Sequence, residues 1–178
     1  QEVTVSCCEG EKGFVYDGNV RFDKKETEID SIEETKTKMM INIANPYHAF
    51  KNSMLPHQGV GLLRLEFIIN NFIKVHPNSL IHYDLYKDTK IKDEELWDNV
   101  RELIGSYKTG EEYYIKKLSY GVGRIAAAFH PHPVVVRFSD FKSNEYKSLL
   151  GGKYFEPDEE NPMIGWRGCS RYYDPKFI

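Results

Sequence analysis

The stretch GVGLLRLEF, residues 59–67, indicates a buried strand that ends on a charged side chain. Its first five residues are apolar or glycine, and Arg64 follows them directly. A near-continuous apolar run of this length is typical of a parallel strand that is covered on both faces. The stretch therefore predicts a strand over 59–64 in a parallel sheet, with a guanidinium group at the end of that strand.

Two further segments have the composition of strands. MMINIA at 39–44 is a short apolar run that Asn45-Pro46 ends, and PVVVRFSD at 133–140 places three consecutive valines before Arg137. Branched apolar residues of this kind are typical of strands. With helical patterns between them, these strands follow the order strand, helix, strand, two helices, strand. That order indicates a parallel α/β architecture.

Helical patterns fill the intervals between the strands. A brief helix is expected at 47–54, and a helix-rich section follows Pro77. Asp93 is placed to cap one helix, and Thr109 with Glu112 forms a capping box for a longer one. Apolar residues recur on one face of each helix, and we expect them to face the core. These residues are Leu96, Trp97, Val100, Leu103 and Ile104 in the first helix, and Leu118, Val122, Ile125 and Phe129 in the second. The segments at 143–146, 149–162 and 165–168 are expected to be loops.

The first residues of the chain predict a separate small β unit. Residues 1–22 alternate weakly between apolar and polar positions, with glycine-rich breaks that favour a hairpin. Residues 23–37 are charged and poor in core residues, so we interpret them as a linker. Residues 38–178 then form the main α/β unit.

The composition excludes several classes of protein. The 178 residues are 40% hydrophobic and 29% charged, which argues for a folded core and against disorder. A net charge of -3 argues against a general nucleic-acid-binding surface. There is no apolar run of about 18 residues and no secretory signal, so no membrane span is expected. The three cysteines, Cys7, Cys8 and Cys169, form no disulfide framework, and we expect a cytoplasmic location.

Arginines end two of the predicted strands in the same way. Arg64 follows LL and Arg137 follows VVV, and the carboxyl ends of parallel strands line the ligand crevice of α/β folds. The planar fork of arginine holds a carboxylate or phosphate through two hydrogen bonds. The pattern therefore predicts a small-anion site, with Arg167 of the GWRG segment as a third candidate. An alternative stays open, in which each arginine only pairs with a carboxylate such as Glu66 or Asp140.

Other chemistry-bearing residues are given structural interpretations. The glycines at 59–61 begin a strand, so we reject a nucleotide-binding loop there. The sequence HPH at 130–132 is expected to be a loop and not a metal site. Cys169 has no evident base beside it and is expected to be a packed thiol. The acidic run at 158–160 is expected to be solvated. A surface turn with Trp166 packed into the core stays open for the GWRG segment.

Several segments together resemble the PEP-utilising enzymes, and within them the phosphoenolpyruvate synthase (pyruvate, water dikinase) branch. Those similar to the opening part of the family's C-terminal phosphoenolpyruvate/pyruvate-binding (βα)8 barrel are KTKMMINIANP (36–46), GVGLLRLEFIINN (59–71), HPNSL (76–80), PVVVRFSDFKSNEY (133–146) and EENPMIGWRGCSRYY (159–173). VTVSCCEGEKGFVYDG (3–18) resembles the stretch that leaves the family's swivelling phosphohistidine domain. The SDFKSNEY segment favours the synthase branch, because the related enzyme I typically has a glycine-rich stretch there.

The resemblance implies an ATP-driven conversion of pyruvate to phosphoenolpyruvate that releases AMP and phosphate. In the family a phosphohistidine carries the phosphoryl group, and Mg²⁺ supports the pyruvate enolate. The family's substrate-binding arginines fall on Arg64, Arg137 and Arg167. No motif for the phosphohistidine, the acidic Mg²⁺ ligands or the proton-donating cysteine occurs here, and Cys169 does not match that cysteine. We therefore expect a partial TIM barrel of about three strands, without catalytic or metal-ligating residues and inactive alone.

Two other readings stay open. One is a non-catalytic module that binds a phosphorylated metabolite or a partner chain, and the other is a relative of pyruvate phosphate dikinase or enzyme I. The expected partners are pyruvate or phosphoenolpyruvate, with ATP in the longer enzyme, and neither nucleic acid nor membrane. Because a three-stranded piece leaves two unpaired sheet edges, we also expect self-association into a homo-oligomer.

Overall fold

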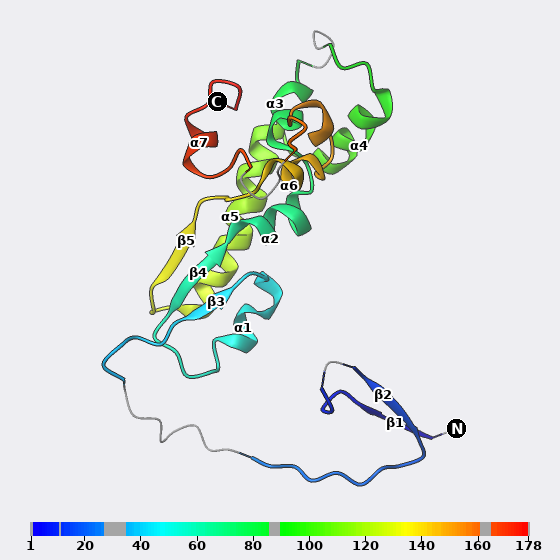
Figure 1. The fold of residues 1–178 in the computed structure, drawn as a ribbon, viewed down its shortest axis with the longest axis vertical. Coiled ribbons are helices and arrows are strands. Elements are labelled where there is room, and N and C mark those ends of the chain that lie inside the picture. The colour runs from blue at the N-terminus through cyan, green and yellow to red at the C-terminus, as the bar shows by residue number, and fades with distance from the viewer. Residues whose placement is uncertain (1, 11, 27–34, 86–89, 161–164, 178) are drawn as a thin grey trace. The chain divides into compact units, whose positions relative to one another are not determined.

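A computed structural model of the chain describes residues 2–10, 12–26, 35–85, 90–160 and 165–177. The chain divides into two compact units, Gln1–Glu34 and Thr35–Ile178 (Figure 1). The boundary between the units falls inside the charged stretch 23–37. Residues 27–34 of that stretch lie outside the described residues.

The first unit is a two-stranded antiparallel hairpin, as the sequence predicts. Strand β1 (Val3–Ser6) pairs with β2 (Phe14–Asp17), with Val3 opposite Asp17 and Ser6 opposite Phe14. The Thr4 hydroxyl donates to the Gly18 carbonyl at 2.8 Å and ties the end of the hairpin together. The predicted hairpin within residues 1–22 is therefore confirmed.

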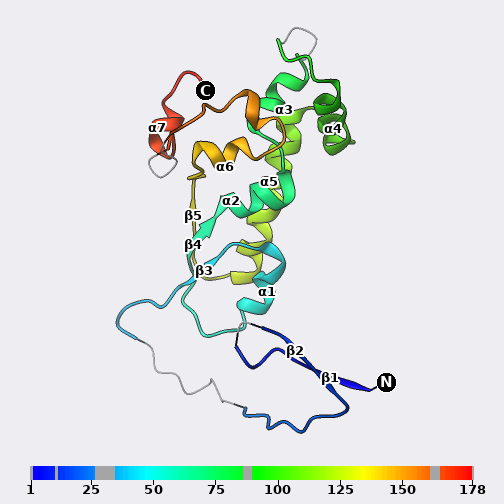
Figure 2. The ribbon, with the colours of Figure 1, turned by 45° about the vertical axis from the view of Figure 1, so that its right-hand side comes forward.

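The second unit is built on a three-stranded parallel sheet. Its strands are β3 (Ile41–Ile43), β4 (Val60–Arg64) and β5 (Val134–Arg137), in the order β3-β4-β5 (Figure 2). The predicted parallel α/β architecture is confirmed. In the described part of the chain this sheet is open and does not close into a barrel.

Strand β4 begins where two strands approach each other closely. The Val60 N–H donates to the Pro133 carbonyl at 2.8 Å. Gly59 has φ +122°, and a Cβ there would lie 2.4 Å from that same carbonyl oxygen, so only glycine fits. Within β4, Val60 and Leu63 are fully buried, whereas Gly61 and Leu62 stay partly exposed. The expected cover on both faces is thus only partly present.

Short helices connect the first two strands and follow the second. The 3₁₀ helix η1 (Pro46–His48) and α1 (Ala49–Asn52) confirm the brief helix expected at 47–54. Directly after β4 the chain forms α2 (Leu65–Ile68) and the π-helix η2 (Ile69–Ile73), which were not predicted. The π-helix closes where the Lys74 N–H donates to the Ile69 carbonyl at 2.7 Å. The stretch LEFIINNFI (65–73) contains no helix-start signal, so tertiary packing decides this turn.

The helix-rich section contains three longer helices, and the two predicted caps are present. These helices are α3 (Pro77–Tyr83), α4 (Glu94–Ile104) and α5 (Gly110–Phe129). The Asp93 carboxylate accepts the Leu96 N–H at 2.9 Å, and the Thr109 hydroxyl accepts the Glu112 N–H at 3.0 Å. The Glu112 carboxylate accepts from Lys108 N–H, one residue before the cap. No described helix is long and apolar enough to cross a membrane.

Helix α5 is the main support of the sheet. It lies along one face of the sheet in Figures 1 and 2, and it contacts α1, α2, α3 and β5. Most of the predicted inward residues are buried, while Leu103, Leu118 and Val122 are partly buried. Gly121 lets α5 approach α2, because a Cβ there would lie 2.7 Å from Ile68 Cγ2.

The described region after β5 contains short helices, two of them where loops were expected. Those two are α6 (Ser143–Lys147) and the 3₁₀ helix η4 (Gly152–Tyr154), and α7 (Cys169–Tyr172) follows the GWRG segment. The loop expected at 143–146 is wrong. There the Glu145 carboxylate accepts the Lys142 N–H at 2.8 Å, and Tyr146 is buried against Phe141 with ring centroids 4.9 Å apart.

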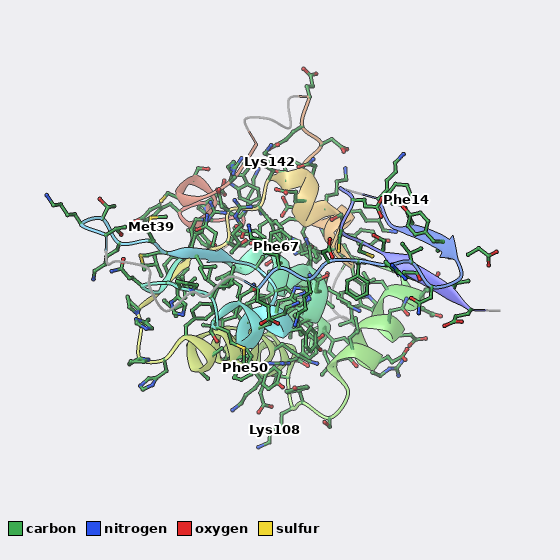
Figure 3. All side chains as sticks on the ribbon, turned by 90° about the horizontal axis from the view of Figure 1, so that it is seen from below. Phe14, Met39, Phe50, Phe67, Lys108 and Lys142 are labelled. Atoms are coloured by element: carbon green, nitrogen blue, oxygen red, sulfur yellow. The ribbon has the colours of Figure 1, made fainter. Side chains whose placement is uncertain are left out.

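Large apolar side chains also remain exposed on the second unit. Met39, Phe50 and Phe67, labelled in Figure 3, are 63%, 68% and 42% exposed. On β5 and just after it, Val135 is 52% and Phe138 is 80% exposed. The outer edge of the sheet and several helix surfaces therefore carry uncovered apolar side chains.

Candidate functional site

The two strand-ending arginines lie side by side. Arg64 at the end of β4 and Arg137 at the end of β5 are Cα partners in the parallel ladder. Both residues are exposed. The sheet register therefore brings two guanidinium groups to one edge, as the repeated sequence pattern predicts.

Two carboxylates lie against Arg137. Its Nη2 donates to Glu66 Oε1 at 3.0 Å, and its Nη1 lies 3.4 Å from Asp140 Oδ2. The Asp140 N–H also donates to Glu66 Oε1 at 2.6 Å, which joins the start of α2 to the loop after β5. For Arg137, the pairing with nearby carboxylates that the sequence left open is thus observed.

Arg167 joins the same cluster through Asp140. Its Nε and Nη2 donate to the two carboxylate oxygens of Asp140 at 3.0 and 2.6 Å, a bidentate pair. The hydrogen bond from Arg167 outweighs partial burial and lowers the pKa of Asp140 below its usual value. Gly165 and Gly168 flank this segment with φ +65° and +59°, a left-handed backbone that favours glycine.

Arg64 differs from the other two arginines. No described residue forms a hydrogen bond or ion pair with it. Glu66 Oε2 is buried and also lacks a hydrogen-bond partner among the described residues. Arg137 and Arg167 thus share two carboxylates, whereas Arg64 has no carboxylate partner among the described residues. An anion at this edge would meet a free arginine beside two that are already oriented.

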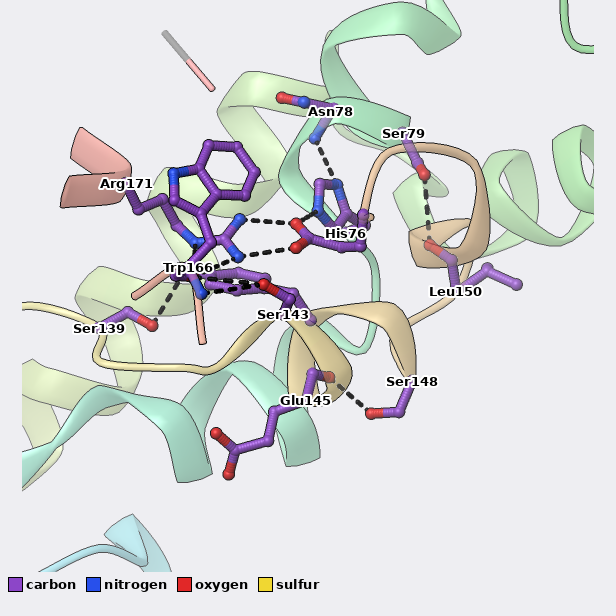
Figure 4. A network of polar contacts seen from close by, with 12 residues as sticks. His76, Asn78, Ser79, Ser139, Ser143, Glu145, Ser148, Leu150, Trp166 and Arg171 are labelled. Atoms are coloured by element: carbon purple, nitrogen blue, oxygen red, sulfur yellow. Dashed lines mark hydrogen bonds and ion pairs between the residues drawn. The ribbon is translucent and has the colours of Figure 1, made fainter. Parts of the chain in front are cut away.

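A buried ionic network lies behind this cluster and was not predicted. Arg171, only 1% exposed, donates from Nη1 and Nη2 to the two oxygens of Glu156 at 2.6 and 2.7 Å (Figure 4). Its Nε and Nη2 also donate to the Trp166 carbonyl at 3.2 and 2.9 Å. Aromatic rings surround the guanidinium, with the centroids of Trp166 and Tyr146 4.1 and 4.3 Å away.

His76 completes the network from the start of α3. Its Nδ1 accepts the Asn78 N–H at 3.1 Å, which places the ring proton on Nε2, 2.9 Å from Glu156 Oε1. Burial lowers the pKa of His76 and outweighs the opposing effect of Glu156, so the ring is neutral. Burial by itself would raise the pKa of Glu156, but hydrogen bonds from His76 and Arg171 outweigh it and lower that pKa.

Other expectations for single residues need correction. Cys169 is exposed and not packed, because it opens the short helix α7 directly after the left-handed Gly168. In the acidic run at 158–160, Asp158 is exposed, but Glu159 is not a solvated side chain. Its Oε1 accepts from the Ser143 hydroxyl and the Trp166 N–H, both at 2.8 Å. Residues 161 and 162 of the expected loop at 149–162 lie outside the described residues.

Comparison with known proteins identifies the family. Residues 21–178 match the family model described as PEP-utilising enzyme, PEP-binding domain. The chain is 50% identical to a phosphoenolpyruvate synthase of Synechocystis, covering 99% of this chain and 21% of that protein. It is 46% identical to the phosphoenolpyruvate synthase of Aquifex aeolicus and 44% identical to that of Escherichia coli. These matches cover 99% of this chain and 25% and 22% of those two proteins.

The chain therefore spans about a quarter or less of the length of these relatives. The matched region begins at residue 21 and contains the whole parallel sheet and all three clustered arginines. The match to the family model over most of the chain shows that the chain belongs to the PEP-utilising enzyme family.

Proposed function

We propose that this chain forms part of the phosphoenolpyruvate/pyruvate site of a phosphoenolpyruvate synthase. That enzyme converts ATP, pyruvate and water to AMP, phosphoenolpyruvate and phosphate through a phosphohistidine. The observation that carries the proposal is the register pairing of Arg64 with Arg137 at the end of adjacent parallel strands. The names of the relatives support the choice of reaction.

The three arginines have distinct roles in this proposal. Arg64, without a partner among the described residues, takes the incoming carboxylate or phosphoryl oxygens first. Arg137 and Arg167 are held in place by Glu66 and Asp140 and turn their remaining N–H groups to the same anion. Preplaced cationic donors stabilise charge on phosphoryl oxygens without reorganisation during the reaction.

The rest of the enzyme is proposed by the same reasoning. In the main unit, residues 38–178, the strands β3, β4 and β5 are the opening strands of a (βα)8 barrel. Residues 1–22 end the phosphohistidine domain, and residues 23–37 link that domain to the barrel. Mg²⁺ would support enolate formation in the longer protein. The described residues contain no group of three or more His, Cys, Asp or Glu side chains that could hold a metal, so none is assigned to Mg²⁺.

The test uses the natural protein that carries this chain. AMP and phosphoenolpyruvate formation from ATP and pyruvate is measured for the wild type, Arg64→Ala and Arg137→Ala. A hydrogen bond to a charged partner contributes about 1.5–3 kcal/mol, so we expect each variant to lose about 10- to 150-fold in turnover efficiency. Arg101→Ala, an exposed arginine on α4 that pairs with Asp98, is the matched control and should keep wild-type rates.

Wild-type rates in both variants would remove the site assignment. If the complete natural protein binds phosphoenolpyruvate but does not convert ATP and pyruvate, the proposal of a non-catalytic binding module replaces that of a synthase. If turnover depends on added phosphate as the second acceptor, the dikinase branch replaces it.

A further inference from the structure

Both backbone polar groups of Trp166 are held by side chains from other segments. Its N–H donates to Glu159 Oε1 at 2.8 Å. Its carbonyl accepts two hydrogen bonds from Arg171. This carbonyl belongs to the peptide that leads into Arg167, so fixing it also fixes the position from which the Arg167 side chain starts.

Arg171 has little freedom to move. Its guanidinium donates four hydrogen bonds, two to Glu156 and two to the Trp166 carbonyl. The side chain is buried, and the Phe177 ring centroid lies 4.9 Å from it, beside the rings of Trp166 and Tyr146. A planar fork with this many partners has one orientation. Figure 4 shows the Arg171 guanidinium beside the Trp166 indole, with dashed lines for its hydrogen bonds.

The hydrogen bonds of Arg171 and Arg167 point to different places. Those of Arg171 go to Glu156 and Trp166, whereas those of Arg167 go to Asp140 in the arginine cluster. Arg171 is therefore not a ligand of the cluster. We propose that Arg171, held by Glu156, is a positioning residue that keeps the Arg167 fork on Asp140, beside Arg137.

His76 extends this support to α3. It donates to the same oxygen of Glu156 that Arg171 Nη1 binds, and it comes from a segment 80 residues away in the sequence. The carboxylate is thereby fixed from two directions, and Glu156 stays ionised. The network thus ties the Trp166–Arg167 peptide to the helical layer, so Arg167 does not depend on the short helix α7 alone.

The test follows the Arg167 Nε–H proton of the chain by NMR. Its signal is identified by its absence in Arg167→Lys, and in the wild type it should exchange slowly with water because it donates to Asp140. Arg171→Lys keeps the charge but cannot bind both Glu156 and the Trp166 carbonyl with the same geometry. We expect faster exchange and a shifted Nε–H signal in this variant. Arg101→Met, at an exposed arginine, should leave the signal unchanged.

A second variant separates positioning from folding. In the double variant Glu156→Gln, Arg171→Met, no buried charge is left unpaired, and the new amide can still accept from His76. Circular dichroism checks that each variant is folded. An unchanged Arg167 Nε–H signal in either folded variant overturns the proposal.

Titration of the natural protein that carries this chain with phosphoenolpyruvate adds a second readout, which rests on the proposed function. We expect about tenfold weaker binding in both variants, equivalent to about 1.4 kcal/mol. Wild-type affinity in a variant whose Arg167 signal has moved would overturn the role of this positioning in binding. If the wild type itself binds no phosphoenolpyruvate while the Arg167 signal still responds to Arg171, the positioning stands and the proposed function fails.

Discussion

Asp140 accepts two hydrogen bonds from Arg167, and one of the same oxygens lies 3.4 Å from Arg137 Nη1. This single carboxylate therefore joins the arginine at the end of β5 to the arginine of the GWRG segment. Its charge decides how firmly both guanidinium groups are held, and that charge is open to titration.

Asp140 should make the stability of the chain depend on pH at the acid end. Its pKa is lowered in the folded state, so its ionised form stabilises the fold above the unfolded-state pKa of about 4. This contribution is lost as the pH falls through the lowered folded-state value. We expect the free energy of unfolding, measured in urea between pH 3 and 6, to fall more steeply for the wild type than for Asp140→Asn. Asp158→Asn, at a carboxylate 95% exposed, is the control and should keep the wild-type slope.

Arg64 and Arg137 should differ in their effect on stability. Arg64 has no partner among the described residues, so Arg64→Ala should change the free energy of unfolding by less than about 0.5 kcal/mol. Arg137→Ala removes a donor from the nearly buried Glu66 and should cost about 1 kcal/mol, a modest value because Arg137 is 42% exposed. Urea unfolding of both variants measures the difference. Equal stability of the two would contradict the observed pairing.

The two glycines inside α5 should respond oppositely to alanine. A Cβ at Gly121 would lie 2.7 Å from Ile68 Cγ2, whereas a Cβ at Gly123 has no atom within 4 Å. Gly123→Ala should stabilise the chain by about 0.5–1 kcal/mol through helix propensity. Gly121→Ala should destabilise it by about 1–3 kcal/mol, because α5 must move away from α2. Thermal unfolding of the pair is the measurement, and a stabilising Gly121→Ala would contradict the close packing of these helices.

The cap of α5 should contribute measurably to stability. The Thr109 hydroxyl accepts the Glu112 N–H, so Thr109→Ala should cost about 1 kcal/mol in urea unfolding. Ser106→Ala, at an exposed hydroxyl three residues earlier, is the control and should have no effect. If both substitutions have the same effect, the cap does not stabilise the helix.

The outer edge of β5 should promote self-association of the isolated chain. In the described residues β5 ends the sheet, and Val135 on it is 52% exposed. A lysine on an edge strand opposes pairing with another strand, so Val135→Lys should lower the average mass in light scattering at high concentration. Ile115→Lys, at an exposed position on α5, is the control and should leave that mass unchanged. A monomeric wild type at high concentration would refute the prediction.

Local sequence patterns predicted the framework correctly. Apolar runs before Arg64 and Arg137 mark where two strands end. The helices that separate these strands in the sequence indicate a parallel pair, which the structure shows. The caps at Asp93 and Thr109 fix the starts of α4 and α5. These features depend on neighbours within a few residues, which is why the sequence alone could show them.

Tertiary packing alone decided which side chains meet. The partners of Arg137 and Arg167 come from separate segments, and the buried network brings together His76, Glu156 and Arg171. The same packing turned 143–146 into a helix and left Cys169 exposed. By itself the sequence determined that arginines would end two neighbouring strands. Only the tertiary structure decided that Arg137 is paired, that Arg64 has no partner among the described residues and that Arg171 is buried, because burial and ion pairing depend on contacts between residues far apart in the chain.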